Sequence, residues 1–254
     1  MFGSFFISIE MLLQRSIIFR PKRLPEEHIF QGKYPLVEYF FDFEVEGNKF
    51  LINAVHIKAL HSKGLVFFLH GTVNHIQYHL PKADFFIELG YDVVMIDYPK
   101  YGKSKGNLTE RLLHIVVELS YQKTLEKIGY PKSVVLYGRS LGTALASNLA
   151  TKVHPDKLIL VSPYFSMPDL FNHKLKLLSF KRLKFKLENF TYLPLVKCDT
   201  YIFHGINDRL IPIELACKLI PFLNSPEYFF SVPGADHFNV HEMSLYKNTL
   251  KVIL

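Results

Sequence analysis

Short runs of apolar residues alternate along the chain with longer segments of helical periodicity. A continuous apolar run bounded by turn residues is typical of a strand buried on both faces of a sheet. The run at 65–69 is of this kind, and further predicted strands, rich in apolar and β-prone residues, occupy residues 91–96, 133–137, 157–161, 200–204 and 227–232. Segments with helical spacing, such as 108–128 and 141–151, lie between them. The alternation predicts an α/β fold, with a doubly wound, mostly parallel sheet flanked by helices and joined by right-handed crossovers.

Two further elements follow from turn residues. The β-rich runs at 36–45 and 49–57 are joined by Glu46-Gly47-Asn48, which predicts a hairpin. A helical stretch before the strand at 91–96 reaches to about Leu89, where Gly90 suits a left-handed helix cap.

Residues 164–197 have mixed periodicity and form an insertion in this pattern. The apolar spacing from Leu170 to Leu178 suits a helix, whereas Leu183, Phe185 and Leu187 alternate with lysines. We interpret the insertion as a short lid over the site. The alternative is a solvated basic helix on the outer face of the sheet.

The first 20 residues form an apolar stub. Glu10 and Arg15 interrupt it, and no uninterrupted run approaches the roughly 20 apolar residues that span a bilayer. It also lacks the basic start and the small-residue cleavage site of a signal peptide. The stub therefore either packs on the body of the protein, which we favour, or lies in a membrane interface. The residues that would insert are Phe5, Phe6, Ile9, Leu12 and Leu13.

Length and composition fit one domain over residues 1–254, because 254 residues with 49% hydrophobic content can bury a large core. Cys198 and Cys217 form no disulfide framework and no C-x-x-C spacing. The net charge is +7, and the excess is local, which argues against a nucleic-acid partner. Six basic residues lie close together at Lys174, Lys176, Lys181, Arg182, Lys184 and Lys186.

The segment Gly138-Arg139-Ser140-Leu141-Gly142 separates a strand from a helix and has the G-x-S-x-G pattern. In a sharp turn of this kind the flanking glycines leave room for a strained serine, whose hydroxyl stands clear of the sheet. The amide of Leu141 would open the helix and could stabilise an oxyanion. The pattern alone also fits an ordinary loop serine. The order of strand, turn and helix favours a nucleophile.

Asp208 and His237 complete a candidate triad with Ser140. Each follows a predicted strand, and the order Ser, Asp, His is that of α/β-hydrolases. The histidine would take the serine proton, and the carboxylate would hold the histidine tautomer. Asp208 could instead cap the helix that begins near Pro212. Asp236 is the other candidate acid, but adjacent side chains point apart, so Asp208 is preferred over it.

His70-Gly71-Thr72 follows the strand at 65–69, at the end of a sheet where such folds place ligands. The backbone amide of Thr72 is therefore the second candidate oxyanion donor. We expect His70 and Gly71 on this loop to contact the substrate, together with Tyr164 and Phe165 at the start of the lid.

These motifs resemble the α/β-hydrolase superfamily, and in particular a short-lidded, membrane-proximal branch that includes protein depalmitoylases. The resemblance extends from Gln14 onward and includes Ile17 to Pro21, Leu24-Pro25, His70-Gly71, Asp97-Tyr98 and Tyr101 to Ser104. It implies a serine hydrolase that cleaves carboxylic esters or thioesters through an acyl-enzyme, without a metal or cofactor. Thr72 replaces the usual Asn of this branch, and Pro99-Lys100 replaces Arg-Gly.

Two other functions fit the same residues. A serine peptidase would use the same triad on amides, and a binding or scaffold protein would keep the fold without activity. A clamp for a substrate ammonium or carboxylate would favour the peptidase, and the sequence shows none. A substituted triad residue would indicate a scaffold, and none is substituted.

The predicted partner is a small acyl ester or an acylated substrate, with an acyl group longer than acetyl. Basic residues of the lid, with Arg20, Lys22 and Arg23, would favour peripheral contact with an anionic membrane. Apolar lid residues would line the acyl site or enter the bilayer, at Leu175, Leu177, Leu178, Phe180, Leu183, Phe185 and Leu187. We therefore expect a cytoplasmic or peripherally membrane-associated protein. A soluble esterase, dispersed by its lid lysines, is the alternative.

Overall fold

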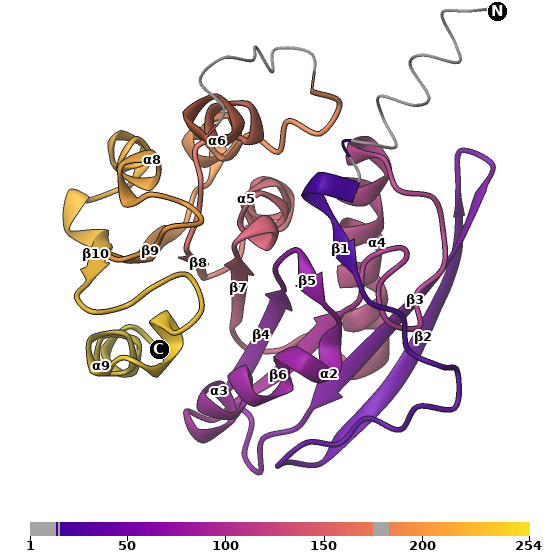
Figure 1. Cartoon of the computed structure of the whole chain (residues 1–254). Coiled ribbons are helices and arrows are strands. Elements are labelled where there is room, and N and C mark those ends of the chain that lie inside the picture. The colour runs from indigo at the N-terminus through magenta and orange to yellow at the C-terminus, as the bar shows by residue number, and fades with distance from the viewer. Residues whose placement is uncertain (1–13, 15, 175–182) are drawn as a thin grey trace, which may run out of the picture.

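In the computed structural model, which describes residues 14, 16–174 and 183–254, the chain forms a mostly parallel sheet flanked by helices (Figure 1). This confirms the predicted fold class. Every pair of neighbouring strands in the main sheet is parallel except the two pairs that include β3. In order across the main sheet, the strands found in the described residues are β10 (Phe229–Val232), β9 (Asp199–Gly205), β8 (Lys157–Val161), β7 (Val134–Arg139), β4 (Gly64–Leu69), β6 (Tyr91–Ile96), β3 (Asn48–Ile57) and β2 (Leu36–Val45).

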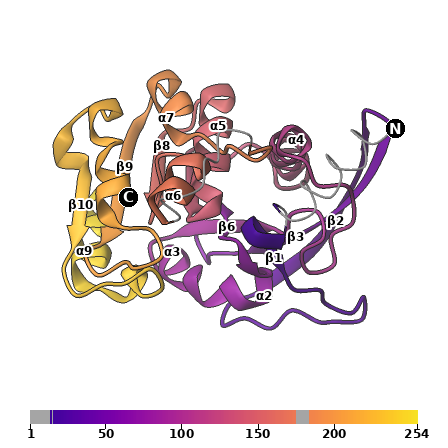
Figure 2. The ribbon, with the colours of Figure 1, turned by 45° about the horizontal axis from the view of Figure 1, so that its top comes forward.

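Helices cover both faces of this sheet. Figure 2 shows α4 and α5 on one side of the strands and α3 and α9 on the other. Besides the helical residues 14 and 16–18, the α-helices in the described part of the chain are α2 (Ile76–His79), α3 (Asp84–Glu88), α4 (Glu110–Ile128), α5 (Leu141–Val153), α6 (Met167–Lys174), α7 (Asn189–Tyr192), α8 (Ile213–Cys217) and α9 (Ser244–Ile253). Single 3-10 turns are η1 (Leu80–Lys82), η2 (Leu193–Leu195), η3 (Ile220–Phe222), η4 (Pro226–Tyr228) and η5 (Val240–Glu242).

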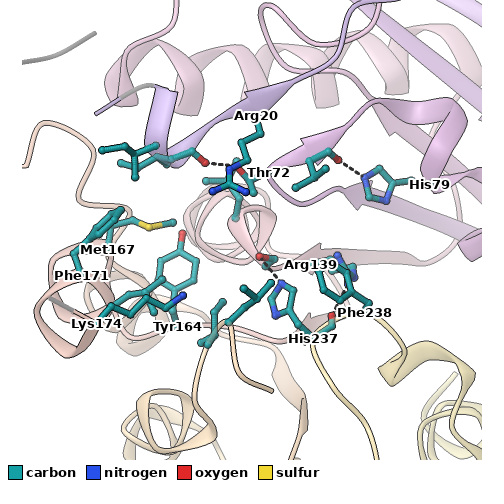
Figure 3. Close-up of a pocket in the computed structure, with 18 of the residues that line it drawn as sticks. Arg20, Thr72, His79, Arg139, Tyr164, Met167, Phe171, Lys174, His237 and Phe238 are labelled. Carbon is teal, nitrogen blue, oxygen red and sulfur yellow. Dashed lines mark hydrogen bonds between the residues drawn. The ribbon is translucent and has the colours of Figure 1, made fainter. Parts of the chain in front are cut away.

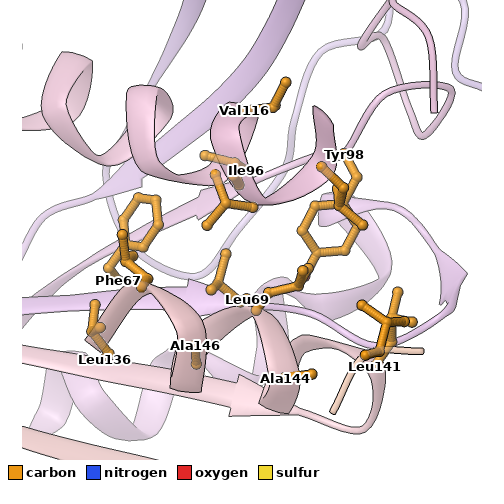
Figure 4. Packing of buried hydrophobic residues seen from close by; sticks show 14 of the residues in the cluster. Phe67, Leu69, Ile96, Tyr98, Val116, Leu136, Leu141, Ala144 and Ala146 are labelled. Carbon is orange, nitrogen blue, oxygen red and sulfur yellow. The ribbon is translucent and has the colours of Figure 1, made fainter. Parts of the chain in front are cut away.

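The structure explains why the sequence of the central strand β4 is wholly apolar. Every residue in it is buried, because successive side chains point to opposite faces and both faces are covered. Phe67 and Leu69 belong to the apolar cluster that includes α4 and α5, and Figure 4 shows them beside Ala146 of α5. Val66 and Phe68 belong to the cluster on the other face.

The hairpin forms as predicted, but its turn is one residue shorter. Asn48 is the first residue of β3 and pairs with Val45, which leaves Glu46 and Gly47 as the turn. Both have positive φ, 52° and 71°, as a two-residue hairpin turn requires.

Two elements have other boundaries in the structure than the sequence predicts. The helical stretch before Gly90 divides into α2, η1 and α3, and Gly90 itself has the expected positive φ of 82°. The last strand begins at Phe229 rather than Glu227, because residues 226–228 form the turn η4. The hydroxyl of Ser225 accepts a hydrogen bond of 3.3 Å from the amide of Glu227 and so caps the start of that turn.

The insertion at 164–197 contains α6, α7 and η2 within its described parts. Leu183, Phe185 and Leu187 were expected to line the acyl site or enter a membrane, and this is wrong. All three are buried in the cluster with α4 and α5, and the Phe185 ring lies 4.9 Å from that of Phe19. The other predicted lid contacts lie outside the described residues, at Leu175, Leu177, Leu178 and Phe180. The division into one domain with a lid stays a prediction.

The described end of the N-terminal stub packs against the body of the protein. Ile18 and Phe19 are buried, and the side-chain oxygen of Gln14 accepts the amide of Lys184 at 2.7 Å. A short strand, β1 (Arg20–Pro21), then pairs in parallel with β5 (Val73–Asn74). The five residues expected to insert into a membrane, Phe5, Phe6, Ile9, Leu12 and Leu13, lie outside the described residues. In the part of the chain that the structure describes, no helix combines the length and hydropathy needed to cross a bilayer.

Candidate active site

Ser140 stands at the turn between β7 and α5 in a strained backbone conformation. Its φ is 52° and its ψ is −118°, a backbone conformation that residues other than glycine rarely adopt. The turn is tight enough to exclude side chains at the two neighbouring glycines. A methyl group at Gly142 would lie 2.1 Å from the carbonyl oxygen of Leu69, and one at Gly138 would lie 2.6 Å from that of Gly142. Only glycine fits at either position.

A chain of hydrogen bonds joins Ser140, His237 and Asp208. The Ser140 Oγ lies 3.1 Å from His237 Nε2, and His237 Nδ1 lies 2.7 Å from Asp208 Oδ2. The other carboxylate oxygen accepts the amides of Leu210 at 2.9 Å and Ile211 at 2.8 Å. With Nδ1–H directed at the carboxylate, Nε2 is the nitrogen that can accept the serine proton.

The surroundings of the two ionisable partners favour a neutral base beside a charged acid. Burial lowers the pKa of His237 below its ordinary value of 6.5, although the hydrogen bond and charge of Asp208 act in the opposite direction. Burial raises the pKa of Asp208, but hydrogen bonds from His204 and His237 outweigh it, and the pKa lies well below its usual range. A neutral imidazole next to a carboxylate is the state in which a general base works.

Asp236, the other candidate acid, belongs to a turn. Its Oδ1 accepts the amides of Phe238 at 2.7 Å and Asn239 at 3.1 Å. The carboxylate beside the His237 ring is therefore that of Asp208, although Asp236 is adjacent in sequence.

The two candidate oxyanion donors, the amides of Thr72 and Leu141, both belong to residues that line the same pocket as Ser140. Leu141 is the first residue of α5, where amides have no acceptor within the helix. Thr72 is held through its carbonyl, which accepts the Tyr101 hydroxyl at 2.8 Å. The preceding Gly71 runs close to Ser140, because a methyl group there would lie 3.3 Å from Ser140 Cβ.

Of the four residues expected to contact the substrate, Tyr164 lines the pocket and the others do not. His70 is fully buried behind it, where its Nδ1 lies 2.7 Å from the Gly71 carbonyl and its Nε2 lies 3.3 Å from Asp97. Phe165 stacks on Phe190 with ring centroids 4.5 Å apart. Substrate contact by His70, Gly71 and Phe165 stays a prediction, and this placement favours a supporting role for them.

The pocket has a volume of about 490 Å³, within the usual range for small-molecule sites (Figure 3). Some of its lining follows the triad closely in sequence: Leu210, Ile211 and Phe238 lie on the loops of Asp208 and His237. The rest is brought in by the fold. Arg139 lies in the G-x-S-x-G segment, and Ile17, Ile18 and Arg20 lie in the N-terminal segment of the resemblance, but neither motif marks them as pocket residues. These lining residues are Ile17, Ile18, Arg20, Val73, Tyr78, His79, Lys82, Arg139, Met167, Leu170, Phe171 and Lys174.

Comparison with known proteins places this geometry in context. A family model described as serine aminopeptidase S33 matches residues 61–192, just over half of the chain. The chain is 33% identical over 153 residues to lysophosphatidylserine lipase ABHD12 of Danio rerio, covering 52% of this chain and 39% of that protein. It is 26% identical over 221 residues to human alpha/beta hydrolase domain-containing protein 17B, covering 85% of this chain and 74% of the relative.

Solved structures show the same fold. The Pyrococcus furiosus esterase PF2001 aligns with a TM-score of 0.68 at 16% identity, covering 93% of this chain and 95% of that one. Est1E from Butyrivibrio proteoclasticus aligns with a TM-score of 0.65 at 18% identity, covering 84% and 97%. Several curated relatives are longer than the matched region: for three of them the match covers 39%, 48% and 64% of their length.

Proposed function

The chain belongs to the serine aminopeptidase S33 family of the α/β-hydrolase superfamily, and from this premise we propose that it cleaves carboxylic esters or thioesters through an acyl-enzyme. The observation that carries the proposal is the hydrogen-bonded series Ser140, His237 and Asp208 at the floor of a pocket. Family membership makes it a hydrolase; the identity of the nucleophile and of the substrate is our proposal.

In the proposed reaction the Ser140 hydroxyl attacks the substrate carbonyl while His237 Nε2 takes its proton. Asp208 stabilises the imidazolium that results. The amides of Thr72 and Leu141 stabilise the negative charge on the tetrahedral intermediate. His237 then returns the proton to the departing alcohol or thiol, and a water molecule, deprotonated by the same histidine, releases the acid from Ser140.

The lining of the pocket supports an acyl group longer than acetyl. Tyr164, Met167, Leu170 and Phe171 form an apolar wall on the lid side of Ser140. Each methylene buried there would contribute about 0.8 kcal/mol to binding. Short acyl groups would leave this wall in contact with water.

A peptidase that binds a free N-terminus needs a negative group to meet the substrate ammonium. None of the described residues that line the pocket is acidic, whereas Arg20, Lys82, Arg139 and Lys174 are basic. These cations would repel an ammonium group. The pocket therefore favours ester or thioester substrates over amino-terminal peptides, even though the family model carries an aminopeptidase description.

Peripheral contact with an anionic membrane is also part of the proposal. Four residues that line the pocket expose large apolar side chains to solvent: Ile17, Tyr78, Leu210 and Phe238. Arg20 and Lys174 line the same pocket and are exposed. An apolar mouth with basic residues is the surface that an anionic lipid interface attracts.

The nucleophile is tested with a fluorophosphonate probe and a panel of nitrophenyl esters of increasing acyl length. We expect one equivalent of probe on Ser140, and no labelling or turnover in Ser140→Ala. The loss in turnover should be on the order of a million-fold, because His237 cannot act as a base in the reaction once the Ser140 hydroxyl is removed. Labelling that persists in Ser140→Ala would contradict the proposal.

Asp208 and Asp236 provide the matched control for the acid. Asp208→Asn should lower kcat by about 10⁴-fold, because the carboxylate no longer holds His237 in the tautomer that accepts the serine proton. Asp236→Asn removes a carboxylate two residues before Phe238 and should change kcat far less. The opposite order would assign the acid to Asp236.

A further inference from the structure

Arg139, the residue before the nucleophile, is a buried cation with no carboxylate beside it. It is 6% exposed and lines the pocket. Its Nη2 donates a hydrogen bond of 2.5 Å to the carbonyl of His237. Among the described residues, no carboxylate oxygen lies within 4.0 Å of the guanidinium. Buried charges are normally paired, and arginine has five N–H donors. The Arg139 guanidinium can therefore donate further hydrogen bonds to an anion.

Lys82 adds a second cation to the same part of the pocket. It is partly buried, and its Nζ lies 5.0 Å from the ring centroid of Tyr78. Burial and then the positive charge of Arg139 lower the pKa of Lys82 to about 8, and the negative charge of Glu242 opposes them only in part. Burial is likewise the main cause that lowers the pKa of Arg139. Two cations that destabilise each other in one pocket would both gain from a bound anion.

Arg139 lies on the side of His237 away from the lid residues, and Lys82, which lines the same pocket, is close enough to Arg139 for the two charges to repel each other. Figure 3 shows Met167 and Phe171 on one side of His237, and Arg139 and His79 on the other. If the acyl chain follows the apolar wall, the alcohol or thiol part of the substrate extends toward Arg139. The charge therefore meets the leaving group and not the acyl group.

We propose that the pocket recognises substrates whose leaving alcohol or thiol carries a carboxylate or phosphate, which binds between Lys82 and the guanidinium of Arg139. This inference rests on the proposed ester or thioester hydrolysis. The anion would accept hydrogen bonds from both cations, and charge-assisted bonds of this kind are about twice as strong as neutral ones. The bound group takes no part in the bond changes at Ser140; it fixes the leaving group in place.

The test compares esters that share an octanoyl group and differ in leaving-group charge. The carboxylate pair is octanoyl 3-hydroxybenzoate and octanoyl 3-hydroxybenzamide, and the phosphate pair is octanoyl glycerol phosphate and octanoyl glycerol. We expect kcat/KM to favour the anionic member of at least one pair by about tenfold or more. The pair with the larger ratio identifies the preferred anion. Equal values within both pairs would overturn the inference.

Lys82→Gln is the informative variant, because Arg139 also contacts the His237 loop. It should lower the anionic-to-neutral ratio by about tenfold. Lys174→Gln removes the same charge at the lid side of the pocket, and Lys251→Gln removes it on α9, outside the pocket. Both should keep the ratio within about twofold of the wild-type value. A ratio that falls equally in all three variants would reduce the effect to general surface charge and overturn the site.

Binding to Ser140→Ala separates this inference from the proposed reaction. By calorimetry, octyl phosphate should bind this variant about tenfold more tightly than octyl glucoside, and Lys82→Gln in the same background should remove the difference. If the protein hydrolyses no ester but shows this difference, the proposed function is wrong and the anion site stands. If it hydrolyses esters without charge discrimination, the anion site alone is wrong.

Discussion

His237 is the residue at which burial has its clearest functional consequence. Burial disfavours the imidazolium, and the positive charge of Arg139 adds to this, so the pKa of His237 is below its ordinary value of 6.5 even with Asp208 beside it. A general base must be neutral to work. We therefore expect kcat/KM for a neutral nitrophenyl ester to be constant as the pH falls to about 6.5, and to decrease only below that value.

Thermal unfolding at each pH provides the control for this profile. The lowered pKa of Asp208 means that its carboxylate stabilises the fold above the ordinary value of 3.8, and that this contribution is lost as the pH falls further toward the folded-state pKa. Because the pKa of His237 is lowered in the folded state, its protonation also destabilises the fold as the pH falls below 6.5, and the melting temperature should decrease in this range. A loss of activity between pH 6.5 and 5, measured well below the melting temperature at each pH, would assign the change to His237. An acid limb centred above pH 7 would contradict the lowered pKa.

The residues of the candidate triad could be predicted because each lies within a few residues of the end of a strand. The sheet topology alone then brings Ser140, Asp208 and His237 to one edge. Lys82 and Arg139 carry no comparable signal. Lys82 ends the turn η1 and Arg139 ends β7, and the fold brings both to one pocket, which no periodicity encodes. The same holds for His70, whose motif suggested substrate contact but whose side chain is fully buried.

At the level of elements, the close approach of α5 to β4 makes Gly142 the most demanding position of the turn. A methyl group there would lie 2.1 Å from the Leu69 carbonyl, so the helix and strand would have to separate. We expect Gly142→Ala to lower the free energy of unfolding in urea by about 3 kcal/mol, as overpacking of a tight contact does. Activity should fall in parallel, since the amide of Leu141 would move.

Gly129, at the end of α4, is the matched control. A methyl group there meets no atom within 4 Å, but its φ of 84° still strains an alanine. Gly129→Ala should therefore cost about 1–2 kcal/mol from backbone strain alone. If both variants lose the same stability, the close contact at Gly142 would have no special importance.

Elements differ in how much of them the apolar pattern encodes. The strands of the parallel region could be predicted because a strand covered on both faces must be largely apolar, as in β4 and, apart from Asp92, in β6. The segment before Gly90 could not be divided correctly, because the breaks between α2, η1 and α3 are single-residue changes in hydrogen bonding. The alternation at 183–187 was visible, but its apolar side faces the core rather than the site.

At the scale of the whole molecule, the mouth of the pocket is surrounded by exposed apolar side chains. The exposed side chains at its mouth come from segments far apart in sequence, and they are large: Ile17 is 55% exposed, Tyr78 50% and Phe238 52%. Only the folded chain gathers them around one opening. Exposed apolar groups around a binding site are typical of a surface that meets a lipid or a protein.

We expect the protein to sediment with vesicles that contain anionic lipid at low salt, and to be released at high salt, because each basic residue near such a surface contributes about 1 kcal/mol. Ile17→Ser should weaken this binding, since it removes an apolar side chain at the mouth of the pocket. Leu60→Ser is the matched control: Leu60 is 91% exposed and is not among the residues that line the pocket. Equal recovery in the supernatant with anionic and neutral vesicles, at both salt concentrations, would contradict the membrane contact. Equal weakening by both serine variants would mean that the contact lies elsewhere than at the pocket mouth.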